Sequence, residues 1–192
     1  TPPILSELNN NPIVANIFLI QPNDAPNVEM NAKTSIIASE QLGGTKLLRT
    51  LLQSVKSPFV AFLLKQTSIQ LGYRCLERMM MVAEDSDAVM VYADHYAIMN
   101  GERCNKPLID YQAGSLRDDF DFGSLVLIRT ECLKAYLKQE NVNNYQFAGW
   151  YDFRLFMSRY GELLHLNEYL YTEVETDQRK SGEKNFDYVD PK

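Results

Sequence analysis

The segment from residue 114 to 124, GSLRDDFDFGS, combines carboxylates, aromatic rings and glycines in one short stretch. Carboxylate oxygens accept hydrogen bonds from sugar hydroxyls, and flat aromatic faces pack against pyranose rings. Phe120 and Phe122 offer such faces here, and Trp150 offers a third. The pattern favours a carbohydrate site. Two interpretations without a ligand stay open: the carboxylates form a solvated turn, and Trp150 and Tyr151 are anchors of the core.

Three further places hold side chains that can do chemistry. Asp152 lies near the beginning of an expected helix, where a carboxylate also interacts favourably with the helix dipole. Asp94 and His95 follow an apolar run, and a capped strand end with a surface histidine explains them equally well. His165, inside the sequence LLHLN, is interpreted as a core or interface histidine.

Composition narrows the class of protein. The chain has 192 residues and a formal charge of −6, with 45% hydrophobic residues, which predicts one globular domain. The negative charge argues against a nucleic-acid partner. The apolar runs are much shorter than the roughly 20 residues of a transmembrane helix. Three cysteines without a C-x-x-C motif favour reduced thiols and a cytoplasmic location.

The order of apolar runs predicts an α/β fold with a mostly parallel central sheet flanked by helices. Strands are expected over residues 14–20, 35–39, 59–64, 88–93, 124–128 and 163–173, and helices at 3–10, after Gly43-Gly44, and over 72–85, 130–138 and 150–160. Sites in parallel sheets lie at the carboxyl ends of strands. The expected ligand-binding edge is therefore formed by Gln21–Asp24, Lys65–Ser68 and Asp94–Tyr96.

Two blocks of the chain resemble family-2 glycosyltransferases. QLGGTKLLRTLLQSVKSPFVAFL is similar to the stretch in which a glycine turn leads into a helix with a basic residue and then a strand. WYDFRLFMSRYGELLHLNEYLYTE resembles the late block "EDydLwLrla..G.i..ipe.LY.y". The resemblance extends from about residue 5 to 176 and implies the GT-A, nucleotide-diphospho-sugar transferase-like fold. Within it, residues 1–98 would form the nucleotide-binding half, 99–176 the acceptor half and 177–192 a charged tail.

The resemblance implies an activity of the hexosyltransferase type. A sugar would pass with inversion from a nucleoside-diphosphate donor, UDP-linked by analogy, to a hydroxyl of a carbohydrate or lipid-linked acceptor. The setting would be bacterial surface polysaccharide or glycoconjugate synthesis, in the cytoplasm or at the inner face of the membrane. No organic cofactor is expected. Asp152 stands at the family's catalytic base, with Tyr151 where a Glu is usual.

The family's acidic metal motif is replaced here by Lys65-Gln66-Thr67. A lysine does not bind Mg²⁺ or Mn²⁺, which prefer oxygen ligands. Lys65 is instead expected to act as a fixed positive charge on a diphosphate. Two alternatives stay open: Asp94, beside His95, supplies a metal ligand, or the metal site is lost.

The remaining expected contacts also follow from the resemblance. Gln21 and Asp24 stand where the family holds the base and ribose of the donor, although an Asn/Asp turn explains them equally well. Arg117, Asp118 and Asp119, with Asp121 after them, would line the cleft between donor and acceptor. Arg179 and Lys180 would fold over the diphosphate or be a solvated tail.

The family's first strand has no counterpart in the sequence. Either about thirty residues, one βα unit, lie upstream in the parent protein, or the domain is a shortened form. If that unit is missing, part of the nucleotide pocket is missing too, and the sheet is expected to expose an edge or an apolar groove, which promotes self-association. Together with the altered metal motif, this keeps an alternative function open: a non-catalytic nucleotide- or carbohydrate-binding domain.

Overall fold

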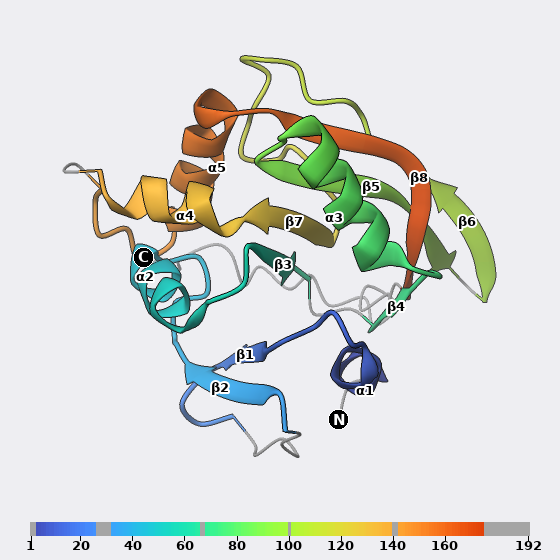
Figure 1. The fold of residues 1–192 in the computed structure, drawn as a ribbon, viewed down its shortest axis with the longest axis horizontal. Helices are drawn as coiled ribbons and strands as arrows, with labels where there is room; N and C mark the ends of the chain where they lie inside the picture. The colour runs from blue at the N-terminus through green and yellow to red at the C-terminus, as the bar shows by residue number, and fades with distance from the viewer. Residues whose placement is uncertain (1–2, 26–31, 66–67, 100, 140–141, 175–192) are drawn as a thin grey trace, which may run out of the picture.

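A computed structural model describes residues 3–25, 32–65, 68–99, 101–139 and 142–174 (Figure 1). The described part is an α/β domain. Its helices are α1 (Pro3–Asn10), α2 (Thr45–Ser54), α3 (Cys75–Ser86), α4 (Thr130–Leu137) and α5 (Gly149–Tyr160). Its strands are β1 (Ile17–Gln21), β2 (Thr34–Ala38), β3 (Phe59–Leu63), β4 (Ser68–Leu71), β5 (Met90–Met99), β6 (Glu102–Lys106), β7 (Leu125–Arg129) and β8 (Leu163–Val174). None of the described helices is long and apolar enough to span a bilayer.

The main sheet is mixed and curls into a half-barrel, so the predicted mostly parallel GT-A sheet is wrong. Its strand order is β3-β7-β5-β8-β4, with β6 also paired to β5. Only the β5–β8 pair is parallel among these strands; β3–β7, β5–β7, β4–β8 and β5–β6 are antiparallel. The β5–β8 register shifts between Ala93 and His95, and an irregularity of this kind increases the local bend and twist of a sheet.

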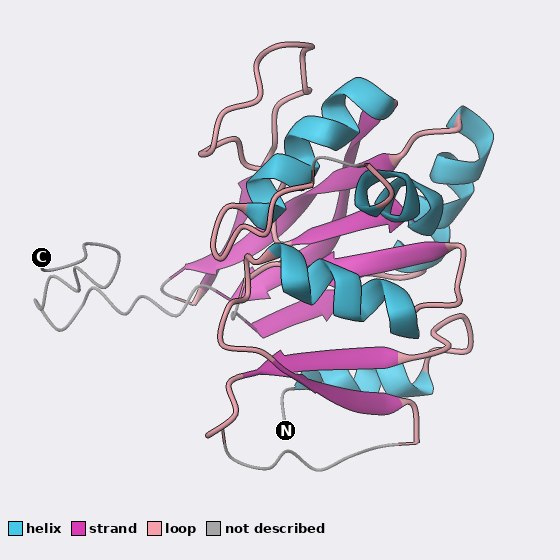
Figure 2. Ribbon diagram, turned by 90° about the vertical axis from the view of Figure 1, so that its left-hand side faces the viewer, coloured by secondary structure: helices cyan, strands magenta, loops and turns pink. Residues whose placement is uncertain are grey.

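A separate two-stranded sheet lies beside the main one. Strands β1 and β2 pair in parallel, with Ile17 opposite Thr34 and Gln21 opposite Ala38. Figure 2 shows this small sheet below the main sheet, next to α1. Within the described residues, β1 pairs only with β2 and β3 only with β7, so each has one edge without a ladder. Helices cover both faces of the main sheet: α2, α4 and α5 lie on one face and α3 on the other (Figure 1).

Strands β5 and β7 divide the core into two layers by simple alternation. Met90, Tyr92, Val126 and Ile128 pack in the layer covered by α2, α4 and α5. The intervening residues Val91, Ala93, Leu125 and Leu127 pack in the layer covered by α3. Both strands are therefore buried on both faces, as their continuous apolar sequences predict.

The strand β5 is longer than the apolar run that predicted it. It continues to Met99, so the expectation that Asp94 and His95 sit at a strand end is wrong. Both are interior residues of the strand and are buried, at 4% and 5% exposure. Their polar groups must therefore find partners inside the protein.

Candidate functional site

A hollow of about 220 Å³ opens between the end of β3, the loop before β7 and the first turns of α5. We call it the Trp150 hollow. Met90 and Val126 belong to its apolar lining and are completely or nearly completely buried. Its aromatic and charged lining consists of Lys65, Phe120, Asp121, Phe122, Trp150 and Arg154. Three distant chain segments thus bring rings, cations and a carboxylate to one place.

Arg154 holds the loop of the hollow in position. Its side chain is 8% exposed, and its guanidinium donates to the carbonyl oxygens of Phe120 at 2.6 Å and Asp118 at 3.3 Å. The guanidinium carbon also lies 4.9 Å from the centre of the Phe122 ring. Burial lowers the pKa of Arg154 from its usual value. Its Nε has no hydrogen-bond partner among the described residues, so this buried cation keeps one donor unused.

A buried polar cluster adjoins the hollow through Lys65. The ammonium of Lys65 lies 3.5 Å from Glu173 Oε1, and Glu173 is 2% exposed. The second oxygen of Glu173 accepts a 2.5 Å hydrogen bond from the Ser124 hydroxyl and lies 3.5 Å from His95 Nε2. The imidazole of His95 stacks on Tyr171, with ring centres 4.9 Å apart. Lys65, which the sequence predicted on this edge, is therefore joined to His95 through a buried carboxylate.

The protonation chemistry of this cluster is set by burial. Burial lowers the pKa of His95, although the nearby carboxylate of Glu173 opposes the shift. His95 Nδ1 is buried and has no partner in the described part of the chain. Burial also raises the pKa of the Tyr171 phenol, whose oxygen accepts a hydrogen bond from Ser124 N at 2.9 Å.

Gly123 joins this cluster to the rim of the hollow. Its φ is +78°, a left-handed conformation that favours glycine, and a Cβ here would collide with the Tyr171 hydroxyl. The amide of Gly123 donates to Asp121 Oδ1 at 2.8 Å, which fixes the carboxylate of Asp121 at the rim. The close approach of Tyr171 and the direction of Asp121 therefore both depend on this glycine.

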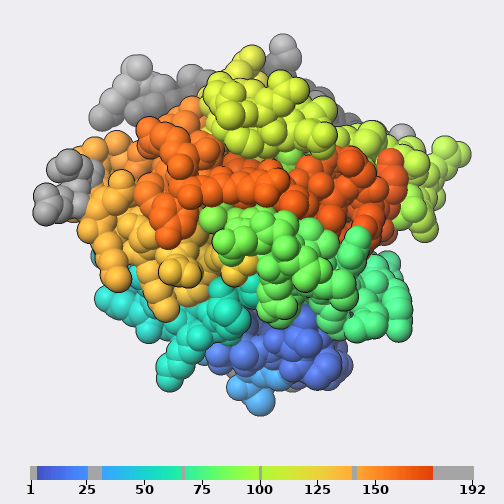
Figure 3. Space-filling view, turned by 45° about the horizontal axis from the view of Figure 1, so that its top comes forward, coloured from blue at the N-terminus to red at the C-terminus, as the bar shows by residue number. Residues whose placement is uncertain are grey.

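His165 anchors the start of the same loop to the sheet. Its Nε2 lies 2.8 Å from Asp94 Oδ1 and its Nδ1 lies 2.7 Å from Asp110 Oδ1. The ring also stacks on Tyr92, with centres 4.8 Å apart. Asp94 accepts a 2.7 Å hydrogen bond from the amide of Leu108 in addition. Figure 3 shows the segment after β6 lying against β8, which carries His165. Asp94 and His165 thus serve the architecture of the loop.

Asp152, the predicted catalytic base, does not line the Trp150 hollow. Its Oδ2 accepts a 2.8 Å hydrogen bond from the Tyr136 hydroxyl on α4. Tyr136 is 1% exposed, and burial followed by the bond to Asp152 raises the pKa of its phenol. The structure therefore places Asp152 at the contact between α4 and α5.

The other predicted contact residues are scattered. Arg117 and Asp119 form an exposed ion pair at 3.0 Å, and neither they nor Asp118 lines the hollow. Gln21 ends β1 in the small sheet, and Asp24 is exposed in the turn that follows. Tyr151 is half-buried on α5 outside the hollow; Gln66, Thr67, Arg179 and Lys180 lie outside the described residues.

The predicted metal ligand Asp94 has its Oδ1 engaged by an amide and by an imidazole. In the described residues no group of three or more His, Cys, Asp or Glu side chains is arranged to hold a metal ion. The charged side chains that line the hollow are those of Lys65, Asp121 and Arg154.

Two residues of the site carry signals that sequence reasoning missed. Arg154 lies on a buried face of α5 together with Phe153 and Met157, and a cation there requires nearby acceptors. Glu173 is itself buried in β8, between the half-buried residues Thr172 and Val174, and a buried carboxylate also requires partners. A charge on an otherwise apolar face was the available signal in both cases.

The chain matches no protein-family model and no curated protein.

Proposed function

We propose that this chain binds a carbohydrate in the Trp150 hollow. The observation that carries the proposal is the convergence of Trp150 and Phe120 with Asp121, Lys65 and Arg154 around one opening. Aromatic faces cover the apolar faces of a pyranose, and the charged groups hydrogen-bond its hydroxyls. Four of these residues, Lys65, Phe120, Asp121 and Trp150, were also singled out from the sequence, whereas Arg154 was not.

The size of the hollow suits a single sugar ring. Its volume of about 220 Å³ is below the range of pockets for drug-sized molecules, which begins near 300 Å³. The rim also offers the right mixture of hydrogen-bonding groups. The Asp121 carboxylate accepts from hydroxyls, the Lys65 ammonium donates to them, and the side chains of both residues are exposed.

Trp150 supplies a direct readout, because it is the only tryptophan of the chain. Its intrinsic fluorescence would be followed while a panel of neutral and acidic monosaccharides and short glycans is titrated. A sugar that enters the hollow changes the polarity around the indole, so a saturable change in emission is expected for at least one member. If no sugar of the panel changes the fluorescence of Trp150, the proposal is rejected.

A matched pair of variants locates the binding. Asp121→Asn keeps an oxygen that accepts from the Gly123 amide but removes the charge at the rim. One hydrogen bond to a charged group contributes about 1.5 kcal/mol, so affinity is expected to fall roughly tenfold. Asp119→Asn, an exposed change in the same loop outside the hollow, is expected to leave affinity unchanged. Equal losses in both variants would contradict the assignment.

A second candidate function is glycosyl transfer, which the resemblance to family-2 glycosyltransferases suggests. The observation that favours it is that Asp121 and two cations share the hollow. Asp121 would take the proton of the acceptor hydroxyl while the oxygen of that hydroxyl bonds to the sugar carbon. The bond from this carbon to the diphosphate breaks at the same time, and Lys65 and Arg154 would stabilise the diphosphate that leaves. This assigns the base to Asp121 in place of Asp152.

Donor hydrolysis separates the two candidates. A panel of nucleotide sugars would be incubated with the wild type, Asp121→Asn and Asp152→Asn. Transfer chemistry predicts that Asp121→Asn loses turnover by at least the roughly hundredfold expected of a general base, while Asp152→Asn keeps it. Hydrolysis at background in the wild type, together with sugar binding, would support the binding function alone.

A further inference from the structure

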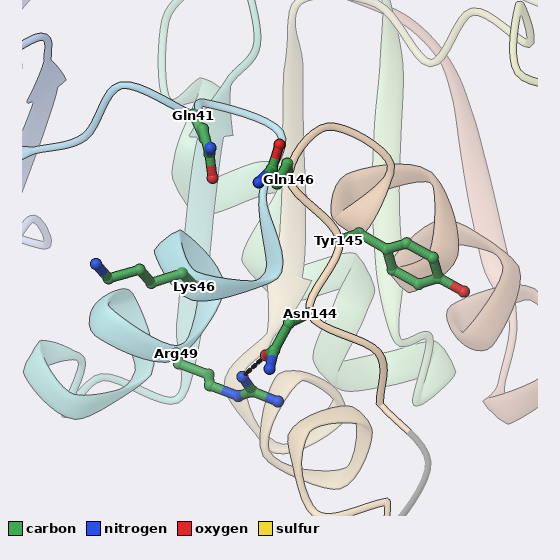
Figure 4. Close-up of a pocket in the computed structure, with 6 residues that line it drawn as sticks. All are labelled: Gln41, Lys46, Arg49, Asn144, Tyr145 and Gln146. Atoms are coloured by element: carbon green, nitrogen blue, oxygen red, sulfur yellow. Dashed lines mark hydrogen bonds between the residues drawn. The ribbon is translucent and has the colours of Figure 1, made fainter.

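A second hollow lies beside the loop that leads into α5. It is a groove of about 350 Å³ between α2 and residues 144–146 (Figure 4). We call it the Arg49 groove. Its lining consists of Gln41, Lys46, Arg49, Asn144, Tyr145 and Gln146, none of which lines the Trp150 hollow. Lys46 and Arg49 are three residues apart on α2, so they share one face of the helix.

The charge of the groove is opposite to that of the chain. The chain has 25 acidic and 19 basic residues, yet the described lining of the groove contains two cations and no carboxylate. Neither Lys46 nor Arg49 forms an ion pair with a described residue. Among the described residues, the guanidinium of Arg49 donates only to neutral acceptors, namely Asn144 Oδ1 and, at 3.5 Å, the Val142 carbonyl oxygen. No described carboxylate therefore neutralises either charge.

The groove has a fixed wall, because the loop is tied to the start of α2. Thr45 donates its amide to the Tyr145 carbonyl oxygen and its hydroxyl to the Asn143 carbonyl oxygen, both at 3.0 Å. A Cβ on Gly43 would lie 2.5 Å from the Phe147 carbonyl oxygen, and one on Gly44 would lie 2.9 Å from that of Gln146. The Gly43-Gly44 pair thus permits the close packing that holds the loop beside Arg49.

We propose that the Arg49 groove binds the phosphate group of a small ligand. The Arg49 guanidinium presents paired N–H donors that match two phosphate oxygens. Lys46, whose side chain extends away from this guanidinium in Figure 4, adds a second positive charge to the lining of the groove. The amide side chains of Gln41, Asn144 and Gln146 can supply further donors to the same oxyanion. The proposal does not depend on carbohydrate binding in the Trp150 hollow, because the two sets of lining residues are distinct.

The test uses inorganic phosphate and the full chain. Phosphate would be titrated by calorimetry and by amide chemical shifts, with glucose 1-phosphate as a second probe that distinguishes a phosphate ester from the free ion. Saturable binding of either probe, with shifts of the Asn144 and Gln146 side-chain amides, is expected. Heats and shifts that do not saturate in the millimolar range with either probe would overturn the proposal.

Variants decide whether the two cations are responsible. Lys46→Ala removes a charge that makes no described hydrogen bond, so the fold is not at risk, and affinity is expected to fall roughly fivefold. Arg49→Lys keeps the charge but loses the paired donors, and a loss of similar size is expected. The control is Lys134→Ala, an exposed cation on α4 outside the groove, which should leave affinity unchanged. Equal affinities in the wild type and Lys46→Ala would overturn the assignment.

Discussion

The hydrogen bond between Tyr136 and Asp152 should contribute measurably to stability. Tyr136→Phe removes the hydroxyl that donates to Asp152 Oδ2 at 2.8 Å, and Asp152→Ala removes the acceptor. Tyr136 is almost fully buried, whereas Asp152 is half-buried on the first turn of α5. Each substitution therefore breaks the contact between α4 and α5 at the same point.

The magnitude follows from the charge and burial of the pair. A hydrogen bond to a charged group contributes about 1.5–3 kcal/mol. Because the carboxylate of Asp152 is partly solvated, each single variant is expected near the lower end, at about 1.5 kcal/mol. Asp152→Ala also removes a favourable charge near the helix N-terminus, which adds about 0.5 kcal/mol. The double variant should lose about 2 kcal/mol rather than the sum, so the coupling energy is roughly 1–1.5 kcal/mol.

Urea unfolding of the wild type, the two single variants and the double variant measures this coupling. Additive losses, to within about 0.3 kcal/mol, would refute the assignment of Asp152 to the contact between the helices. The same variants should bind the sugar ligand of the Trp150 hollow with unchanged affinity. A selective loss of activity in Asp152→Asn, with stability unchanged, would restore Asp152 as a catalytic candidate.

Three further substitutions probe His95 in the buried cluster and two glycines that make close contacts, Gly149 and Gly123. Because burial lowers the pKa of His95, the unfolded chain takes up the histidine proton at a higher pH than the folded chain, so stability is lost as the pH falls below about 6.5. His95→Gln should remove this pH dependence. In urea unfolding, the slope of the unfolding free energy against pH in that window should fall by up to about 1.4 kcal/mol per pH unit. Gly149→Ala puts a Cβ 2.8 Å from the Thr45 hydroxyl oxygen and against backbone, and overpacking of about 1–3 kcal/mol should lower the midpoint of thermal unfolding; an unchanged midpoint would contradict the packing. Gly123→Ala combines a left-handed φ with a collision at the Tyr171 hydroxyl, and a loss of about 2 kcal/mol in urea unfolding is expected.

Much of the element pattern could be predicted because burial on both faces leaves a clear signal. The runs that became β5 and β7 are almost entirely apolar, and both strands lie between two core layers. The same feature hides strand direction, since a continuous apolar run reads identically in parallel and antiparallel sheets. Strands β4 and β6 could not be predicted from apolar runs: β4 has four residues, and β6 is a polar edge strand, ERCNK.

The candidate site could be predicted only in part, because apolar runs indicate where strands lie but not which distant residues pack against them. Lys65 was expected after a buried strand over residues 59–64; the structure places it just beyond β3 and beside the hollow, but β3 is an edge strand that is only partly buried. Asp94 and His95 looked like a strand end because the apolar residues stop before them. Their buried positions depend on partners far along the chain, namely His165 and Glu173, which no local pattern reveals.

The geometry of α5 explains why the most conspicuous carboxylate is not in the hollow. An α-helix turns about 100° per residue. Asp152 is two residues after Trp150, so its side chain points to nearly the opposite side of the helix. Arg154 is four residues after Trp150 and returns to the same side as Trp150. Trp150 and Arg154 accordingly line the hollow together, while Asp152 faces Tyr136 on α4. One helix therefore cannot present both Trp150 and Asp152 to a single ligand. Any chemistry in the hollow that needs a carboxylate falls instead to Asp121, which the Gly123 amide fixes at the rim.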